Sequence, residues 1–217
     1  MWAKRRDKTG LRPYLENMTR MPAYDRDAAL EAAIRLFWAK GYHATSLKDL
    51  ENALNMRPGS IYAAFKSKQA LFLAAMERYF EKMQAGFRAH MAEAASPLHG
   101  LTSFLRAYAE DGSSVRVHAC LLLKTLLEAT TTDSEIADPA RDYLDRMKGE
   151  FEAGLSAAQA AGEFPDAADT ARLARRYQAA LTSLQVELQR GLSGEELAGF
   201  VEDLVEPFDR LAEEAAS

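Results

Sequence analysis

Residues 45–68 predict two short helices joined by a tight turn. The first is expected to begin at Ser46, because its hydroxyl can cap the free amide three residues on while Asp49 reaches back, as in a capping box. The apolar residues that follow lie three or four positions apart and therefore share one helical face: Leu47, Leu50 and Leu54.

The turn and the second helix follow directly. Asn55 tolerates turn conformations, and Arg57 is pushed out of the helical region because it precedes Pro58. Pro58 suits the first position of a helix, so a second short helix is expected to run from there through Phe65. Ile61 and Phe65 lie four residues apart and would pack on the first helix. This arrangement is a helix-turn-helix.

The outer face of the second helix carries small or hydrogen-bonding residues, Gly59, Ser60, Tyr62 and Ala63. Such groups can approach the phosphates and base edges of DNA. The alternative is a helical hairpin that only packs against the rest of the chain. The polar and basic character of this face favours DNA as the partner.

Three stretches in this region resemble the DNA-binding domain of the tetracycline-repressor (TetR) family: Ala33 to Tyr42, Thr45 to Leu47, and Gly59 to Phe72. The resemblance covers roughly residues 26–75 and keeps the order and spacing of the family motif. It implies an all-helical homodimer that acts as a transcriptional regulator, usually a repressor released from its operator by a small ligand.

The resemblance also implies which residues contact DNA. Positions matching Thr45, Ser60, Tyr62 and Lys68 commonly do so in the family, and the full set expected here is Thr45, Ser46, Lys48, Arg57, Gly59, Ser60, Tyr62, Lys66 and Lys68. The family often has His or Tyr where this chain has Ala63–Ala64. Base reading is therefore expected to depend more on Arg57, Ser60 and Tyr62.

The net charge of -5 is unevenly distributed along the 217 residues. Residues 1–21 carry +4, residues 22–90 carry +3, and residues 91–217 carry -12. The positive potential that phosphate binding needs therefore coincides with the helix-turn-helix, and the acidic remainder would stay off the duplex.

Composition and motifs exclude several other classes. The single cysteine, Cys120, rules out an internal disulfide framework, and no apolar run reaches the ~20 residues of a membrane span. No secretory signal follows the basic start, so a soluble cytoplasmic protein is expected. The four histidines lack metal-ligand spacing, and no phosphate-binding loop or catalytic constellation is recognisable. We predict no enzyme activity, no cofactor and no metal.

Three regions are expected along the chain. Residues 1–24 are basic and lack periodicity, which indicates a disordered extension: either an arm for the minor groove or the product of a start assigned too far upstream, with Met18 or Met21 as the real one. Residues 25–72 form the DNA-binding domain, and a long helix over residues 67–93 links it to a helical ligand-binding and dimerisation domain over residues 73–217.

Every segment of the chain predicts helix, so the fold class is all-α. The first helix should open near Asp25 or Asp27 and stop at Gly41, with a buried stripe formed by Leu30, Ala33, Ile34 and Phe37. Beyond the long linking helix, the expected helices cover residues 96–112, 115–131, 133–162, 166–191 and 193–215. The helix over 115–131 is apolar almost all round and is expected to be central and buried.

The last two helices are joined by a short Gly-Leu-Ser-Gly connection and must be antiparallel. In the resembled family this pair forms a four-helix bundle with its copy. A dimer would place two recognition helices one duplex turn apart, about 34–36 Å, to read a palindrome. The expected dimer residues are Leu181, Leu184, Leu188, Phe200, Leu204 and Phe208, although these stripes can also bury against their own subunit.

A cavity for an apolar or electrophilic effector is implied by the resemblance. Its expected lining comes from the middle helices: Phe104, Tyr108, His118, Cys120, Leu122, Thr125, Met147, Phe151, Tyr177 and Gln178. Each of these can instead be ordinary core, because such stripes are how helices pack. His118 could activate the Cys120 thiol as a sensor; the competing interpretation is a buried, inert thiol.

Two functions from different classes remain open on sequence alone. The first is a DNA-binding regulator whose effector changes the separation of its two recognition helices. The second is an all-helical protein that binds a small molecule and uses its basic N-terminal domain for protein contacts.

Overall fold

The computed structural model describes residues 25–114, 120–129 and 133–215, and within these ranges every regular element is a helix. Residues 1–24, which include the predicted basic extension, lie outside the described part. In chain order the helices are α2 (Arg26–Lys40), α3 (Leu47–Leu54), α4 (Pro58–Phe65), α5 (Lys68–Glu93), α6 (Pro97–Ser114), α7 (Leu121–Glu128), α8 (Ser134–Ala160), α9 (Thr170–Arg190) and α10 (Gly194–Ala215).

Helix boundaries in the N-terminal part follow from local capping chemistry. The Asp25 carboxylate accepts hydrogen bonds from the amides of Asp27 and Ala28, and Gly41 ends α2 with a φ of 82°. Ser46 and Asp49 form the predicted capping box at the start of α3. Ser67 caps α5 by accepting from the Ala70 amide. The predicted starts of these helices are confirmed.

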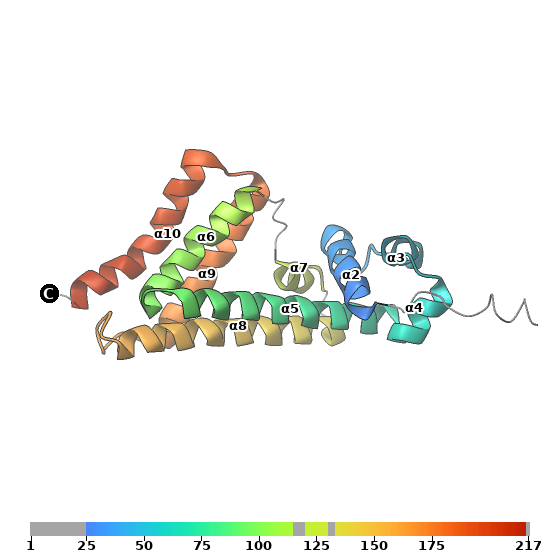
Figure 1. Cartoon of the computed structure of the whole chain (residues 1–217), viewed down its shortest axis with the longest axis horizontal. Coiled ribbons are helices and arrows are strands. Elements are labelled where there is room, and N and C mark those ends of the chain that lie inside the picture. Colours follow the sequence, from blue (N-terminus) through green and yellow to red (C-terminus); the bar gives the residue numbers. More distant parts are fainter. Residues whose placement is uncertain (1–24, 115–119, 130–132, 216–217) are drawn as a thin grey trace, which may run out of the picture.

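The molecule is elongated, with α2, α3 and α4 gathered at one end and α6, α9 and α10 at the other (Figure 1). The two long helices α5 and α8 run side by side along the body between these ends, and α7 lies next to α2. Because α5 is continuous from the small N-terminal helices into the body, it connects both ends mechanically.

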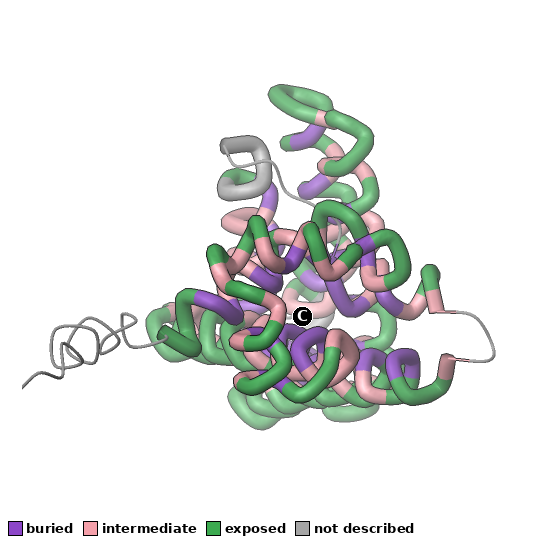
Figure 2. Tube along the Cα trace, turned by 90° about the vertical axis from the view of Figure 1, so that its right-hand side faces the viewer, coloured by how far each residue is buried: buried purple, intermediate pink, exposed green. Residues whose placement is uncertain are grey.

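The hydrophobic core is one continuous cluster that extends from α2 to α10. Figure 2 shows buried residues on the inward sides of the helices and exposed residues on their outer turns. The predicted inward stripe of α2 is confirmed, since Leu30, Ala33, Ile34 and Phe37 are all buried. No helix among the described residues is long and apolar enough to cross a membrane.

Within the described residues, the helix predicted over residues 115–131 is present but shorter. The described helix, α7, covers only Leu121–Glu128, and Val115 and Thr131 lie outside the described residues. Leu121, Leu122 and Thr125 face the core, whereas Leu127 is 78% exposed. When a helical run is apolar on every side, its sequence pattern does not indicate which side of the helix faces solvent.

Two other boundaries differ from the prediction. Helix α9 begins after Asp169, which caps it by accepting from the Arg172 amide, rather than at Asp166. The preceding turn is held by the Gln159 side-chain amide, which donates to the carbonyls of Pro165, Asp166 and Ala168. Helix α6 continues to Ser114, two residues beyond the predicted end at Gly112.

Candidate nucleic-acid interface

Helices α3 and α4 are joined by the turn Asn55–Arg57, and each turn residue has a physical role. Asn55 adopts the left-handed conformation, with a φ of 51°, and its amide donates to the Glu51 carbonyl. Arg57 is extended, as expected of a residue before proline, and Pro58 occupies the first position of α4. The chain thereby turns sharply within three residues.

Buried aromatic and aliphatic side chains fix α4 on the rest of the domain. Ile61 and Phe65 are buried on the inner side of α4, and Leu50 is buried on α3. Behind them the Phe72 ring packs against Phe37 and Tyr42, with ring centroids 4.8 and 4.9 Å apart. Such a packed support holds the outer face of α4 in a defined orientation.

Most residues predicted to contact DNA lie at this surface. Arg57, Gly59, Tyr62, Lys48 and Lys66 are exposed, and Ser60 and Lys68 are partly exposed. Tyr62 is 46% exposed, which makes it one of the few large apolar-bodied side chains open to solvent in the described chain. No side chain caps the N-terminus of α4, so its first free amide is open to an anion.

Thr45 and Ser46 are placed differently from the other predicted residues. Thr45 is only 1% exposed, and its hydroxyl donates to the Gly41 carbonyl at 2.6 Å. The Ser46 hydroxyl is engaged by Asp49, as acceptor of its amide and donor to its carboxylate. Both hydroxyls therefore shape the start of α3, and neither is free to donate to a phosphate.

An ion pair and a cation-π contact organise the charges beside α4. The Lys40 ammonium donates to the Asp49 carboxylate, and this bond, with those from Ser46, holds the pKa of Asp49 well below its usual range. The Lys68 ammonium lies 4.5 Å from the centroid of the Tyr42 ring. Burial lowers the pKa of Lys68, and nearby Asp49 opposes that effect.

Lys66 links α4 to α5 in a conformation that the sequence did not indicate. Its φ of 71° and ψ of -51°, with a 2.8 Å hydrogen bond from the Ser67 amide to the Phe65 carbonyl, define a γ-turn with positive φ. This conformation is rare and strained for a residue with a side chain. It directs the chain from the outer helix straight into α5.

A groove of about 930 Å3 runs between α2 and the turn before α4. Its lining includes Arg35, Asn52, Asn55, Arg57 and Ser60. Two of the predicted DNA-binding residues therefore border a concave polar surface next to the N-terminus of α4.

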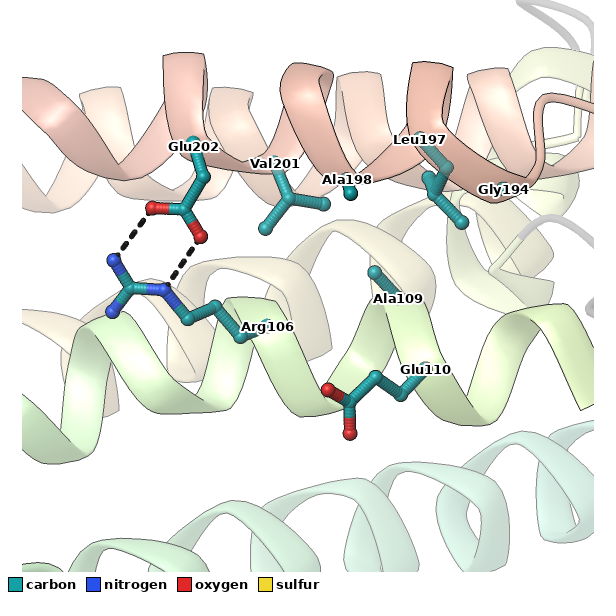
Figure 3. A pocket seen from close by; sticks show the side chains of 8 residues that line it. All are labelled: Arg106, Ala109, Glu110, Gly194, Leu197, Ala198, Val201 and Glu202. Carbon is teal, nitrogen blue, oxygen red and sulfur yellow. Dashed lines mark hydrogen bonds and ion pairs between the residues drawn. The ribbon is translucent and has the colours of Figure 1, made fainter.

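The residues predicted to line an effector cavity lie inside the body, except His118, which is outside the described residues. Leu122, Thr125, Met147, Phe151 and Tyr177 are buried, and Phe104, Tyr108 and Gln178 are partly buried. Four pockets formed by described residues lie elsewhere, including one between α6 and α10 (Figure 3), and none is lined by a residue of this set.

A buried polar cluster, unnoticed in the sequence, lies among these residues. The Gln185 amide, which is buried on α9, donates to the Tyr108 hydroxyl at 3.2 Å. Nearby, the Cys120 thiol and the Tyr79 hydroxyl share a hydrogen bond, and burial raises the pKa of the thiol. A raised thiol pKa keeps Cys120 protonated and less nucleophilic.

The residues predicted at a dimer interface divide into two groups. Leu181, Leu184 and Phe208 are buried within the chain's own core. Leu188, Phe200 and Leu204 are only partly covered, and Val186, also on α9, is 44% exposed. A second copy could therefore contact the latter residues but would find little surface on the former.

Comparisons with known proteins agree with this geometry. Residues 29–75 match the family model described as "Bacterial regulatory proteins, tetR family". The chain is 30% identical over 180 residues, 82% of its length, to the HTH-type transcriptional repressor ComR of Escherichia coli (strain K12), and the match covers 86% of that protein. It is 28% identical over 173 residues to an uncharacterized HTH-type transcriptional regulator, YezE, of Bacillus subtilis (strain 168), covering 77% of this chain and 87% of YezE.

A solved structure with the same fold contains DNA. It is a cysteine mutant of the TetR family transcriptional regulator CifR complexed with 26bp double-strand operator DNA. The two chains are 28% identical, with a TM-score of 0.76 over 86% of this chain and 98% of that one.

Proposed function

This chain belongs to the tetR family of bacterial regulatory proteins, and from that premise we propose a homodimer that binds a palindromic operator and is released by a small effector. The chain is a DNA-binding transcriptional regulator, as its curated and structural relatives support. Operators lie on the bacterial chromosome, so we place the protein in the cytoplasm.

The outer face of α4 carries the DNA-binding part of the proposal. Tyr62, Lys66 and Arg57 project from it into solvent, and the uncapped N-terminus beside Gly59 offers a free amide to a phosphate. Ser60 and Tyr62 are short or planar enough to reach base edges in a major groove. For Thr45 and Ser46 the proposed role is indirect: they fix the start of α3 and do not themselves contact the DNA.

The effector part rests on the polar cluster of Tyr79, Tyr108, Cys120 and Gln185. Three helices of the body and the residue that precedes α7 contribute hydrogen-bonding groups to this cluster, which an apolar core does not require. A ligand that engages it would need higher affinity for the state that cannot bind DNA. Helix α5, which contributes Tyr79 and continues to the DNA-binding end, would transmit the change.

The operator is tested first, by selecting bound fragments from the genome and titrating one of them at several salt concentrations. We expect Tyr62→Ala to weaken binding roughly 10- to 100-fold without changing the oligomeric state, because one base or backbone contact is worth about 1–3 kcal/mol. Lys68→Ala should weaken binding less selectively and reduce the slope of log affinity against log salt by about one.

Arg141→Ala is the matched control, because Arg141 is exposed on α8 and pairs only locally with Asp138. It should leave affinity unchanged. Absence of sequence-selective binding at any salt concentration would contradict the operator proposal and favour the alternative, an all-helical small-molecule-binding protein. Unchanged affinity in both Tyr62→Ala and Lys68→Ala would instead reassign the DNA-binding face.

A further inference from the structure

The first residue of α2 is an exposed arginine, Arg26, whose charge is not neutralised by a neighbouring carboxylate. The positive end of a helix dipole disfavours a cation at this position. Asp25 and Asp27 stand on either side of it in the sequence, but the Asp25 carboxylate accepts hydrogen bonds from the amides of Asp27 and Ala28 instead. Within the described part of the chain, Arg26 forms no ion pair with these or any other carboxylates.

The Arg26 guanidinium lies over the ring of Phe65, 5.1 Å from the ring centroid. Phe65 is the last residue of α4 and is buried, so this contact brings the start of α2 to the C-terminal end of α4. A cation over an aromatic face is attracted by the quadrupole of the ring, and a guanidinium held in this way keeps N–H donors for another partner. The ring therefore positions Arg26 without using its hydrogen bonds.

This end of α4 is continuous with the proposed DNA-binding face. The Lys66 amide donates to the Tyr62 carbonyl at 2.9 Å, so the two residues are one turn apart, and both side chains are exposed. Helix α4 has eight residues and is therefore about 12 Å long, close to the width of the DNA major groove. Because phosphate strands border that groove on both sides, cations at either end of α4 can reach one of them. Arg57 stands at the N-terminal end and Arg26 beside the C-terminal end.

We propose that Arg26 binds a phosphate of the operator backbone beside the C-terminal end of α4, with Phe65 as the platform that holds it. This inference rests on the proposed DNA-binding face and extends it to a residue of α2, outside the helix-turn-helix. A guanidinium can bind a phosphate through two parallel hydrogen bonds, which fix orientation as well as adding charge. Phosphate contacts carry no sequence information directly, so Arg26 would raise affinity for any duplex and leave the choice of bases to α4.

The test measures binding of the full-length protein to an operator fragment and to an unrelated duplex of equal length, each at several salt concentrations. Arg26→Met removes the charge and keeps an apolar cover on Phe65. We expect it to weaken binding to both duplexes by the same factor, about 10-fold, and to reduce the slope of log affinity against log salt by about one. Arg26→Lys keeps the charge but not the planar fork, so it should retain the slope and lose less affinity.

Arg141→Met on α8 is the matched control, because Arg141 is exposed and pairs only with Asp138 on its own helix. It should change neither the affinity nor the salt slope. Arg26→Gln repeats the removal of charge with a different side chain, and urea unfolding of each variant checks that its stability matches that of the wild type. The result then does not depend on how one substituted side chain packs.

Unchanged affinity and slope in both neutral variants at Arg26 would overturn the phosphate contact. A loss of affinity confined to the operator would also overturn it, because that result indicates base reading. If the wild-type protein binds the two duplexes equally, the operator proposal fails, whereas the Arg26 contact is still measured on either duplex.

Discussion

At the scale of single residues, Lys66 is the point of highest backbone strain beside the proposed DNA-binding face. Its positive φ closes a γ-turn between α4 and α5, and its side chain is exposed. Glycine adopts such a conformation without steric penalty. Strain at an exposed residue between α4 and α5 indicates that stability has been exchanged for the orientation of these two helices.

We predict that Lys66→Gly is more stable than Lys66→Ala by about 1 kcal/mol, because both lose the charge and only glycine relieves the strain. Urea unfolding curves of the two variants give the difference. Ala63→Gly, in the regular part of α4, should have the opposite sign and cost about 1 kcal/mol. Equal stabilities of the two Lys66 variants would contradict a strained turn.

Cys120 gives a second prediction at this scale. The thiol is 3% exposed and burial raises its pKa, so little thiolate exists at neutral pH. N-ethylmaleimide should therefore react at least about 100-fold more slowly with the native protein than with the urea-unfolded chain, and Cys120→Ser should bind the operator normally. Rapid native alkylation that releases DNA would revive the sensor interpretation.

Residue roles were predictable where the chemistry is local. The capping by Ser46 and Asp49 and the proline start of α4 follow from neighbouring residues alone. Thr45 shows the limit: its family position implied a DNA contact, but in the folded chain the residue is buried and its hydroxyl donates to the Gly41 carbonyl. Gln185 and Tyr108 lie 77 positions apart, so no local pattern could indicate their bond.

At the scale of elements, α7 connects the body to the DNA-binding end. Its Lys124 ammonium donates to the Trp38 carbonyl at 2.7 Å and to the Ala39 carbonyl at 3.4 Å, at the C-terminus of α2. Glu128, one turn on, has its carboxylate against Gly41, where any Cβ would collide with it. A cation at a helix C-terminus satisfies free carbonyls and complements the helix dipole.

We predict that Lys124→Met lowers the free energy of unfolding by about 1–2 kcal/mol, since it removes a charged hydrogen bond but keeps most of the apolar stem. Amide exchange should accelerate at residues 37–41, the end of α2. Lys148→Met is the control: its exposed pair with Asp145 should contribute less than about 0.5 kcal/mol. Equal losses of stability in the two variants, or unchanged amide exchange in α2, would show that α7 does not link the two ends of the molecule.

Element prediction succeeded where a helix has two distinguishable faces. The stripe of α2 follows from periodicity, and the start of α5 follows from its serine cap. The boundaries of α7 did not follow, because Leu121, Leu122 and Leu123 are apolar whichever way the helix is turned. Its contact with α2 depends on Lys124, and nothing in the sequence distinguishes this lysine from an ordinary solvent-exposed one.

At the scale of the whole molecule, the all-helical class and the separation of a basic end from an acidic body were readable from the sequence. The position of the closing helices was not. The sequence pattern predicts Leu184 and Phe208 at a dimer interface, yet α6 and the rest of the chain's own core already cover them. A sequence stripe identifies a buried face but cannot tell which subunit buries it.

Buried phenols and a thiol govern how this core responds to alkaline pH. Burial raises the pKa of Tyr79 and Tyr177 well above the usual value, and it also raises the pKa of Tyr108 and Cys120. In the unfolded chain these groups ionise near their ordinary pKa, about 8.5 for cysteine and 10 for tyrosine. Their stabilising effect is therefore complete below those values and is lost as pH rises towards the raised pKa of each group.

We predict that the free energy of unfolding is level near neutrality, begins to fall above pH ~8.5 because of Cys120, and falls more steeply above pH ~10, by up to about 1.4 kcal/mol per pH unit for each buried phenol. Tyr177→Phe removes one of these groups together with the 2.8 Å bond from its hydroxyl to the Leu101 carbonyl. It should cost about 1 kcal/mol at pH 7 and then lose stability less steeply, so that its curve meets the wild-type curve near pH ~11. Urea unfolding from pH 7 to 11.5 measures the stability of both proteins. Tyr62→Phe, at an exposed tyrosine, is the control. Parallel curves of stability against pH for Tyr177→Phe and wild type would show that this phenol does not cause the loss of stability at high pH.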